Sequence, residues 1–141
     1  MSDPSCVFCK IVAGQIPCHK VFEDPDTLAF LDIGPLAEGH LLVIPKEHYG
    51  RLDQMPPELA GRVMAHLPRL SRIVSQVTGQ QGFNILQNND EVAGQLVPHV
   101  HFHIIPRRAG DGLGYRWNKT EYPPGAAERM RDRLLGALRT Q

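Results

Sequence analysis

The sequence predicts an α+β fold with about five strands in one antiparallel sheet, one long helix and a C-terminal helix. Two observations carry this prediction. Several short apolar runs end at turn-forming residues, as strands do, and two longer stretches repeat apolar residues at helical spacing. The chain has 141 residues, which is the size of one ordinary domain and enough to bury a core without disulfide bonds. We therefore expect residues 1–141 to form a single domain.

The predicted strands are short apolar runs bounded by turn signals, such as Asp24-Pro25-Asp26 between the first two strands and Pro45 after the third. The first three strands resemble a small antiparallel meander. The five strands are expected over residues 21–23, 28–31, 41–44, 82–86 and 100–105.

Residues 57–77 predict the long helix, because apolar side chains recur there at helical spacing and Gly79 supplies a stop. Pro68 lies inside this pattern, where it removes a backbone hydrogen bond and is expected to bend the axis. A terminal helix is predicted over residues 126–138. Its inward-facing side chains are expected to be Met130, Leu134, Leu135 and Leu138.

Charge and hydropathy exclude several classes of protein. Lys plus Arg and Asp plus Glu each number 15, and the sequence pI is about 7.1, so no global field attracts nucleic acid or an anionic membrane. No window approaches the ~18 apolar residues of a membrane span. The first residues lack a basic region followed by an apolar stretch, so we expect a cytoplasmic protein.

The most informative segment is residues 99–105, which reads His-Val-His-Phe-His-Ile-Ile. Strand side chains point alternately to opposite faces, so His99, His101 and His103 share one face and the intervening apolar residues share the other. One face is predicted to be core and the other to carry chemistry, since imidazoles act as proton acceptors, nucleophiles and metal ligands near neutral pH. The alternative is a solvated strand face, which more naturally carries Lys, Glu or Thr.

This heptad matches the motif that defines the histidine triad (HIT) family of nucleotide hydrolases and transferases, which the chain resembles over roughly residues 5–120. His103 resembles the Hint and Fhit branches, because the galactose-1-phosphate uridylyltransferase branch has a glutamine there. The small domain favours the Hint-like branch. The resemblance implies a HIT-like fold. Further runs similar to those of bacterial members occur at residues 6–11, 28–33, 39–46 and 93–95.

Three histidines are the catalytic candidates. An imidazole suits phosphoryl transfer because it attacks as a neutral base and leaves again from an activated phosphoramidate. His101 has an imidazole on both sides to orient it, and the resemblance implies the same role: it attacks the α-phosphate and forms a nucleotidyl-histidine that water hydrolyses. The resemblance also implies that His103 contacts the phosphate and that His40 hydrogen-bonds within the active site.

Two residues after an apolar run are candidates for nucleotide binding. The Asp32 carboxylate is able to accept hydrogen bonds from two ribose hydroxyls, and Ile33 is able to pack on a base. The resemblance supports both roles. The alternative for Asp32 is an ordinary turn residue before Gly34-Pro35.

The loop before the heptad is predicted to present hydrogen-bond donors to phosphate oxygens. Its candidate residues are Asn88, Gly94, Gln95 and Leu96. Gly94 permits close backbone approach, Gln95 adds an amide, and the resemblance places a phosphate-contacting amide at Asn88. The alternative is an ordinary polar turn. Leu96 departs from the Ser or Thr that many Hint-like and Fhit-like members carry there, so one hydroxyl donor is missing.

Cys6, Cys9, His48 and His99 form a candidate metal site, since two thiolates and two imidazoles suit tetrahedral zinc. The resemblance supports zinc, because several bacterial members with this Cys-x-x-Cys and a histidine after Ile-Pro-Lys bind it. Full protein ligation leaves no position for a catalytic water, so the zinc is expected to be structural. The alternatives are two small buried residues on a short amphipathic helix and a thioredoxin-like redox pair. Cys18 is left as a free thiol.

The predicted function is hydrolysis of nucleoside 5'-monophosphates, with purine bases, joined to an amine or another leaving group. The first alternative is an Fhit-like dinucleoside polyphosphate hydrolase, and the second is a nucleotide-binding scaffold with little turnover, which Leu96 favours. The resemblance implies a twofold homodimer, in which Tyr115 and Trp117 are expected to pack on the neighbouring subunit. No nucleic-acid or membrane partner is expected.

Overall fold

The computed structural model describes residues 2–114 and 118–141, which include the predicted strands and helices. The chain forms two units, Met1–Asp111 and Gly112–Gln141, and each is described by itself. Tyr115 and Trp117, which the sequence predicts at a subunit contact, lie outside the described residues.

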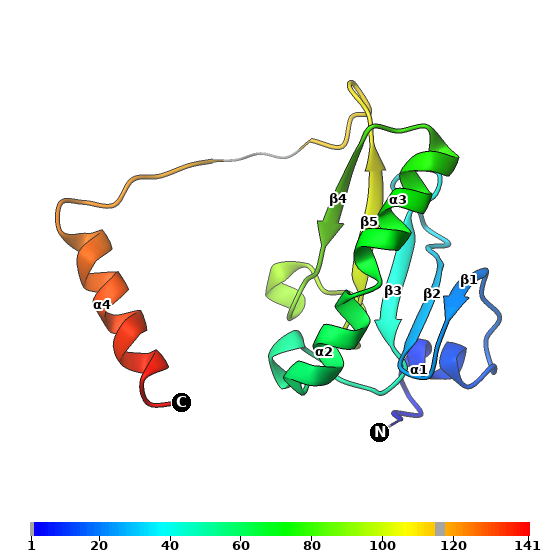
Figure 1. Ribbon diagram of the computed structural model, residues 1–141, viewed down its shortest axis with the longest axis horizontal. Helices are drawn as coiled ribbons and strands as arrows, with labels where there is room; N and C mark the ends of the chain where they lie inside the picture. Colours follow the sequence, from blue (N-terminus) through cyan, green and yellow to red (C-terminus); the bar gives the residue numbers. More distant parts are fainter. Residues whose placement is uncertain (1, 115–117) are drawn as a thin grey trace. The chain divides into compact units, whose positions relative to one another are not determined.

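A five-stranded antiparallel sheet forms the first unit and confirms the predicted fold class (Figure 1). The order of the strands is β1-β2-β3-β5-β4, so β5 lies inside the sheet, between β3 and β4, although it comes last in the sequence. His103 on β5 pairs with Leu42 of β3 on one side and with Leu86 of β4 on the other. The strands are β1 (Lys20–Glu23), β2 (Thr27–Leu31), β3 (Leu41–Pro45), β4 (Gly82–Leu86) and β5 (Phe102–Arg107).

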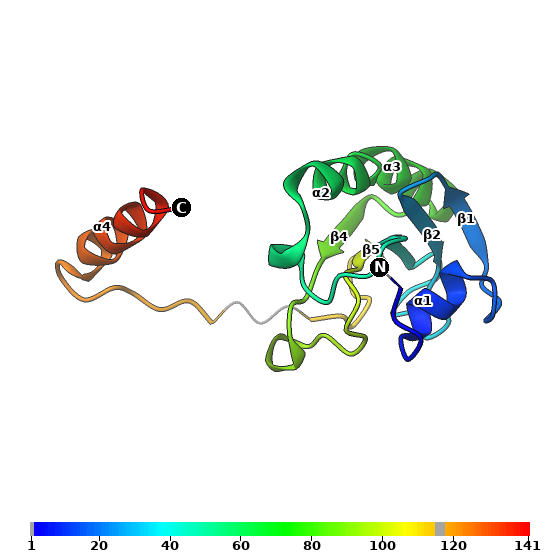
Figure 2. The ribbon, with the colours of Figure 1, turned by 90° about the horizontal axis from the view of Figure 1, so that it is seen from below.

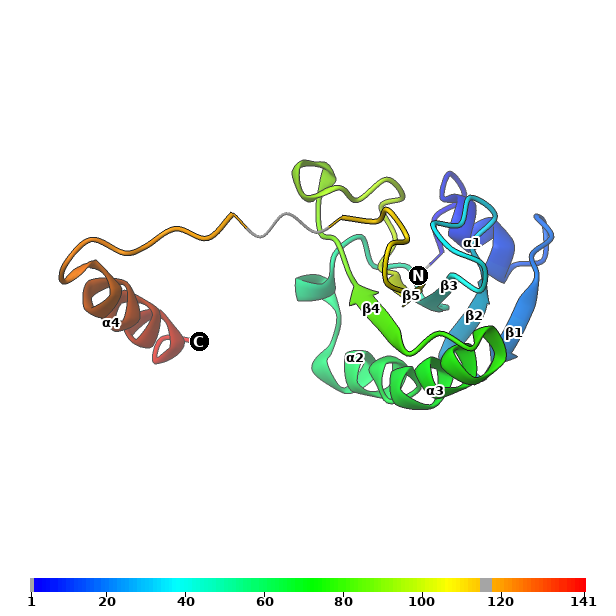
Figure 3. The same cartoon turned by 90° about the horizontal axis from the view of Figure 1, so that it is seen from above.

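Helices α2 (Pro57–Met64) and α3 (Leu67–Thr78) cover one face of the sheet, and α1 (Val7–Val12) lies on the other face (Figures 2 and 3). Under α2 and α3, apolar side chains of the helices pack with Val100, Phe102 and Ile104 in one buried cluster. A second buried cluster lies under α1 and joins its side chains to those of β2 and β3. The apolar side of the heptad is therefore core, as predicted.

Two predicted elements have different limits in the structure. The long helix is divided at Ala65 and His66, because Pro68 occupies the first turn of α3, where a missing N–H costs no intrahelical hydrogen bond. Strand β5 begins at Phe102 instead of Val100, since the Val100 N–H donates to the Tyr49 carbonyl oxygen (2.7 Å) and not to the sheet.

The second unit contains α4 (Ala126–Leu138), whose limits agree with the prediction. The predicted burial of its apolar face is wrong: α4 has no buried residue, and Met130, Leu134, Leu135 and Leu138 are all exposed. Helical spacing identifies an apolar face but contains no information on what covers it. Two short 3-10 helices, at Leu52–Gln54 and Glu91–Ala93, complete the secondary structure of the described residues.

None of the helices in the described part of the chain is long and apolar enough to cross a membrane.

We expect Gly39→Ala to lower the free energy of unfolding by about 2–3 kcal/mol, because Gly39 has a positive φ and a Cβ there would lie 2.6 Å from Thr78 Cγ2. Gly14→Ala is the control for φ alone, since no atom lies within 4 Å of its Cβ position, and its cost should be about 1 kcal/mol. Gly61→Ala on α2 has open space and should stabilise by about 0.5–1 kcal/mol. Urea unfolding of the three variants measures this ranking, and equal effects at Gly39 and Gly14 would contradict it.

Candidate active site

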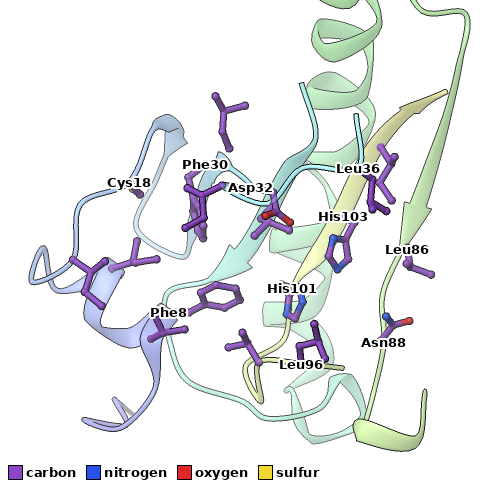
Figure 4. Close-up of a pocket in the computed structure, with 18 of the residues that line it drawn as sticks. Phe8, Cys18, Phe30, Asp32, Leu36, Leu86, Asn88, Leu96, His101 and His103 are labelled. Atoms are coloured by element: carbon purple, nitrogen blue, oxygen red, sulfur yellow. The ribbon is translucent and has the colours of Figure 1, made fainter. Parts of the chain in front are cut away.

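A pocket of about 430 Å³ opens on the face of the sheet that carries α1 (Figure 4). Asn88, His101 and His103 lie together at one end, the polar end, and Phe8, Cys18 and Phe30 lie toward the other, apolar end. Asp32 also lines the pocket, and further apolar lining side chains are Val7, Ile11, Ile16 and Pro17. A pocket with both kinds of side chain suits a ligand that combines an apolar part with a polar, charged part.

The His101 imidazole is held in one tautomer by the backbone. Its Nδ1 lies 2.7 Å from the His99 carbonyl oxygen, which only accepts, so Nδ1 carries the proton and Nε2 keeps its lone pair. The side chain is 6% exposed, and burial lowers the pKa of His101. The structure therefore presents a neutral imidazole with one free nitrogen in the wall of the pocket.

A chain of hydrogen bonds sets His103 in the opposite tautomer. The Leu36 N–H donates to His40 Nδ1 (3.0 Å), so the proton of neutral His40 is on Nε2. That Nε2 lies 2.8 Å from His103 Nδ1, to which it donates, and His103 therefore carries its own proton on Nε2. Burial lowers the pKa of His103 to about 4, and the nearby His101 and His40 add to this shift. His103 is thus a neutral hydrogen-bond donor beside His101, with ring centroids 4.9 Å apart.

Asp32 lies at the edge of this hydrogen-bond chain and lines the pocket. Its Oδ2 is 3.6 Å from His40 Nε2, and its Oδ1 accepts from the Gly34 N–H (2.8 Å). Asp32, His40 and His103 are close enough to be considered as metal ligands. However, the Leu36 N–H directs the only lone pair of neutral His40 away from this group, so a catalytic hydrogen-bond chain suits it better.

The loop between β4 and β5 brings Asn88, Gly94 and Leu96 to the pocket, as the sequence predicts, but not Gln95. The Gln95 amide is buried, donates to the Gly50 carbonyl oxygen (2.7 Å) and accepts from the Asp90 N–H (2.7 Å). It therefore braces the loop instead of facing a ligand. The sequence could not show this, because Gly50 is distant in the chain. Asn88 Nδ2 donates to the Gly94 carbonyl oxygen (3.3 Å).

Ile33 and Leu96 both line the pocket and are each 90% exposed. Both are among the predicted nucleotide-binding residues. Large apolar side chains with so much exposed surface gain free energy when a ligand covers them.

The four predicted metal ligands come together beside this pocket. Cys6 and Cys9 come from the N-terminal end of α1, His48 follows β3, and His99 precedes β5. Their ligand atoms lie within 4.8 Å of one another. His99 Nε2 donates to the Pro45 carbonyl oxygen (2.8 Å), which leaves the Nδ1 lone pair directed at the two sulfur atoms. Burial lowers the pKa of His99 to about 4 and raises that of Cys6. A cation here would compensate the negative charge of two buried thiolates.

Phe8 is a residue of the site that the sequence analysis missed. It lies between the two cysteines on α1, lines the pocket, and packs edge-on against both His99 and His101. The signal was present in the sequence, because Phe8 and Ile11 are three residues apart and therefore share one face of a helix.

Comparisons with known proteins relate this chain to one family. The model of the HIT domain family matches residues 13–110. The chain is 40% identical over 136 residues to an adenosine 5'-monophosphoramidase of Schizosaccharomyces pombe, covering 96% of this chain and 99% of that protein. A crystal structure of a Streptococcus mutans protein superposes with a TM-score of 0.93 at 41% identity, covering 97% and 87% of the two chains. A zinc-bound histidine triad family protein from Mycobacterium smegmatis has a TM-score of 0.74 at 36% identity, covering 97% and 98%.

We expect NMR spectra to show the Nδ1–H tautomer for His101 and the Nε2–H tautomer for His40 and His103.

His103 should stay neutral well below pH 6.5, toward its pKa of about 4. The unfolded chain binds this proton near pH 6.5, so stability that is present above pH 6.5 should be lost as the pH falls toward 4. Tautomer-sensitive nitrogen shifts and unfolding at pH 7 and pH 5 test both statements. A His103 pKa of 6.5 or higher would contradict the burial argument.

Proposed function

The chain belongs to the HIT domain family, and we propose that it is a hydrolase of purine nucleoside 5'-monophosphates joined to an amine. The observation that carries this proposal is the arrangement of His101 and His103. The Nε2 atom of His101 is unprotonated and that of His103 is protonated. The two rings lie side by side in the wall of one pocket. A nucleophile next to a donor is the pair that phosphoryl transfer needs.

In the first step, His101 Nε2 attacks the α-phosphorus, a P–N bond to the histidine forms, and the P–N bond to the leaving amine breaks. The positive charge that develops on the His101 ring is stabilised by its Nδ1–H hydrogen bond to the His99 carbonyl oxygen. The His103 Nε2–H donates to a phosphate oxygen, and His40 keeps the His103 proton on that side. The leaving nitrogen takes one proton from solvent and departs as a neutral amine.

In the second step, water attacks the phosphorus of the nucleotidyl-histidine and the P–N bond to His101 breaks. The mononucleotide and neutral His101 are released, and one proton of the water returns to solvent. Overall, one water cleaves one phosphorus–nitrogen bond. Asn88 at the polar end supplies a second donor to the phosphate, its side-chain amide, and Asp32 accepts from the ribose hydroxyls. The apolar end takes the base, against Phe8 and Phe30.

We also propose that the second cluster holds a structural zinc ion. Ligands of a tetrahedral zinc ion lie about 3.3 Å apart for two nitrogens and about 3.6 Å for nitrogen and sulfur, given the usual bond lengths. Here the two Nδ1 atoms of His48 and His99 are 3.2 Å apart, and nitrogen to sulfur distances are 3.3–3.6 Å. When bound, zinc would neutralise the thiolates and tie α1 to the segment that leads into β5.

Two further parts of the proposal are a cytoplasmic location and a twofold homodimer. β4 is an edge strand of the sheet and exposes Phe83 and Ile85 on one side. This apolar edge is a surface that a sheet continuing into a second subunit would cover.

Single-turnover reaction with adenosine phosphoramidate tests the enzyme proposal. We expect AMP release by the parent, a loss of at least about 1,000-fold in His101→Ala, and a loss of about 100-fold in His103→Ala, which removes one donor. His19→Ala is the matched control, because His19 is exposed on the surface and does not line the pocket. Its rate should equal that of the parent.

Other outcomes of this reaction would favour the alternatives. AMP binding without turnover of either substrate class would indicate a nucleotide-binding scaffold. Faster cleavage of a dinucleoside polyphosphate than of the phosphoramidate would indicate an Fhit-like hydrolase. Leu96→Ser places a hydroxyl donor in the pocket. Faster turnover in that variant would show that the lack of this donor at Leu96 slows the reaction.

Metal analysis tests the zinc site. The purified protein should contain about one zinc ion per chain, and Cys9→Ser should lose it together with at least about 2 kcal/mol of stability. Cys18→Ser is the matched control, since Cys18 is a free cysteine outside the cluster. Equal zinc content in the two variants would contradict this assignment.

A further inference from the structure

Helix α1 contributes to two sites at once. It is only six residues long, and its N-terminal end carries Cys6 and Cys9, two of the four candidate metal ligands. Val7, Phe8 and Ile11 of the same helix line the nucleotide pocket. Such a short helix has little stability of its own, and no side chain caps its N-terminus. Its position against the sheet therefore depends on tertiary contacts.

Phe8 connects the two sites directly. The ring is buried, with its centroid 5.8 Å from that of His99 and 5.2 Å from that of His101, edge-on in both cases. It also packs edge-on against Phe30, another residue of the pocket, at 5.7 Å. Phe8 thus touches a metal ligand, the nucleophile and the base-binding end of the pocket. Any displacement of α1 changes all three contacts.

His99 forms a second connection through the backbone. Its side chain is fully buried and directs Nδ1 at the cysteines, while its carbonyl oxygen accepts the hydrogen bond that orients His101. A metal ion held by His99 Nδ1 and by the α1 thiolates would restrain both connections together. The nucleotide, in turn, would pack against the α1 side chains and His101.

We propose that the metal site and the nucleotide pocket are thermodynamically coupled through α1 and His99, so that each ligand strengthens the binding of the other. This inference rests on the proposed function. Reciprocity is required by linkage: if zinc raises the affinity for a nucleotide by some factor, the nucleotide raises the affinity for zinc by the same factor. Couplings between two sites are typically about 5- to 150-fold.

The test measures both directions with AMP as the nucleotide. Calorimetry gives the AMP affinity of zinc-loaded and zinc-free protein, and competition with a chromogenic chelator gives the zinc affinity with and without saturating AMP. We expect zinc removal to weaken AMP binding by about 5- to 150-fold and AMP to tighten zinc binding by the same factor. Circular dichroism of the zinc-free protein reports whether the sheet stays folded.

Two variants separate this coupling from general stabilisation of the fold. Phe8→Leu keeps an apolar side chain but removes the edge-on contacts, so the coupling factor should fall toward one. Lys10→Ala changes α1 at a position that neither lines the pocket nor belongs to the metal cluster, and its factor should match that of the parent.

Equal AMP affinities with and without zinc would overturn the inference and leave the proposed function intact. The inference would also be overturned if Phe8→Leu had the same coupling factor as the parent and the zinc-free protein were unfolded. The effect of zinc on AMP binding would then come from folding of the whole domain. If zinc-loaded parent protein does not bind AMP, the proposed function itself is overturned.

Discussion

The hydrogen bond from His99 Nε2 to the Pro45 carbonyl oxygen is the constraint on which both sites depend. It joins the segment before β5 to the end of β3 and fixes which His99 nitrogen is free to bind a metal. The backbone of the same residue then sets the tautomer of His101. His99 therefore determines that its own Nδ1 lone pair faces the thiols and that the His101 Nε2 lone pair faces the pocket. Both rings are oriented by uncharged backbone carbonyl groups.

Neutrality is the common property of the imidazoles around the pocket. Burial disfavours the charged form of His40, His101 and His103, and hydrogen bonds to backbone groups or to another ring replace the solvent that they lose. The chain carries no net charge to attract an anion. Affinity for a phosphate must therefore come from directed N–H donors, which act strongly because the site is partly withdrawn from water.

Much of the fold could be predicted because the decisive patterns are local. Alternation over residues 99–105 identifies a core side and a histidine side from the backbone geometry of a strand alone. Helical spacing located α4 equally well but was misleading about its surroundings, since Met130 and Leu134 are exposed. The division of the long helix at His66 was missed for a related reason. Pro68 is compatible with a bend or with a new helix start, and packing on the sheet decides between them.

The sequence by itself determined which residue types are present for chemistry, on which side of β5 they lie, and the family whose motif they match. Only the tertiary structure decided which hydrogen bonds each side chain makes. Gln95 braces a loop because Gly50 lies opposite it, and His103 is a donor because the Leu36 N–H points at His40. A side-chain pattern defines a face within one element. The proton on each ring, however, is set by whichever backbone donor or acceptor the fold brings from a distant segment, and that partner is not encoded locally.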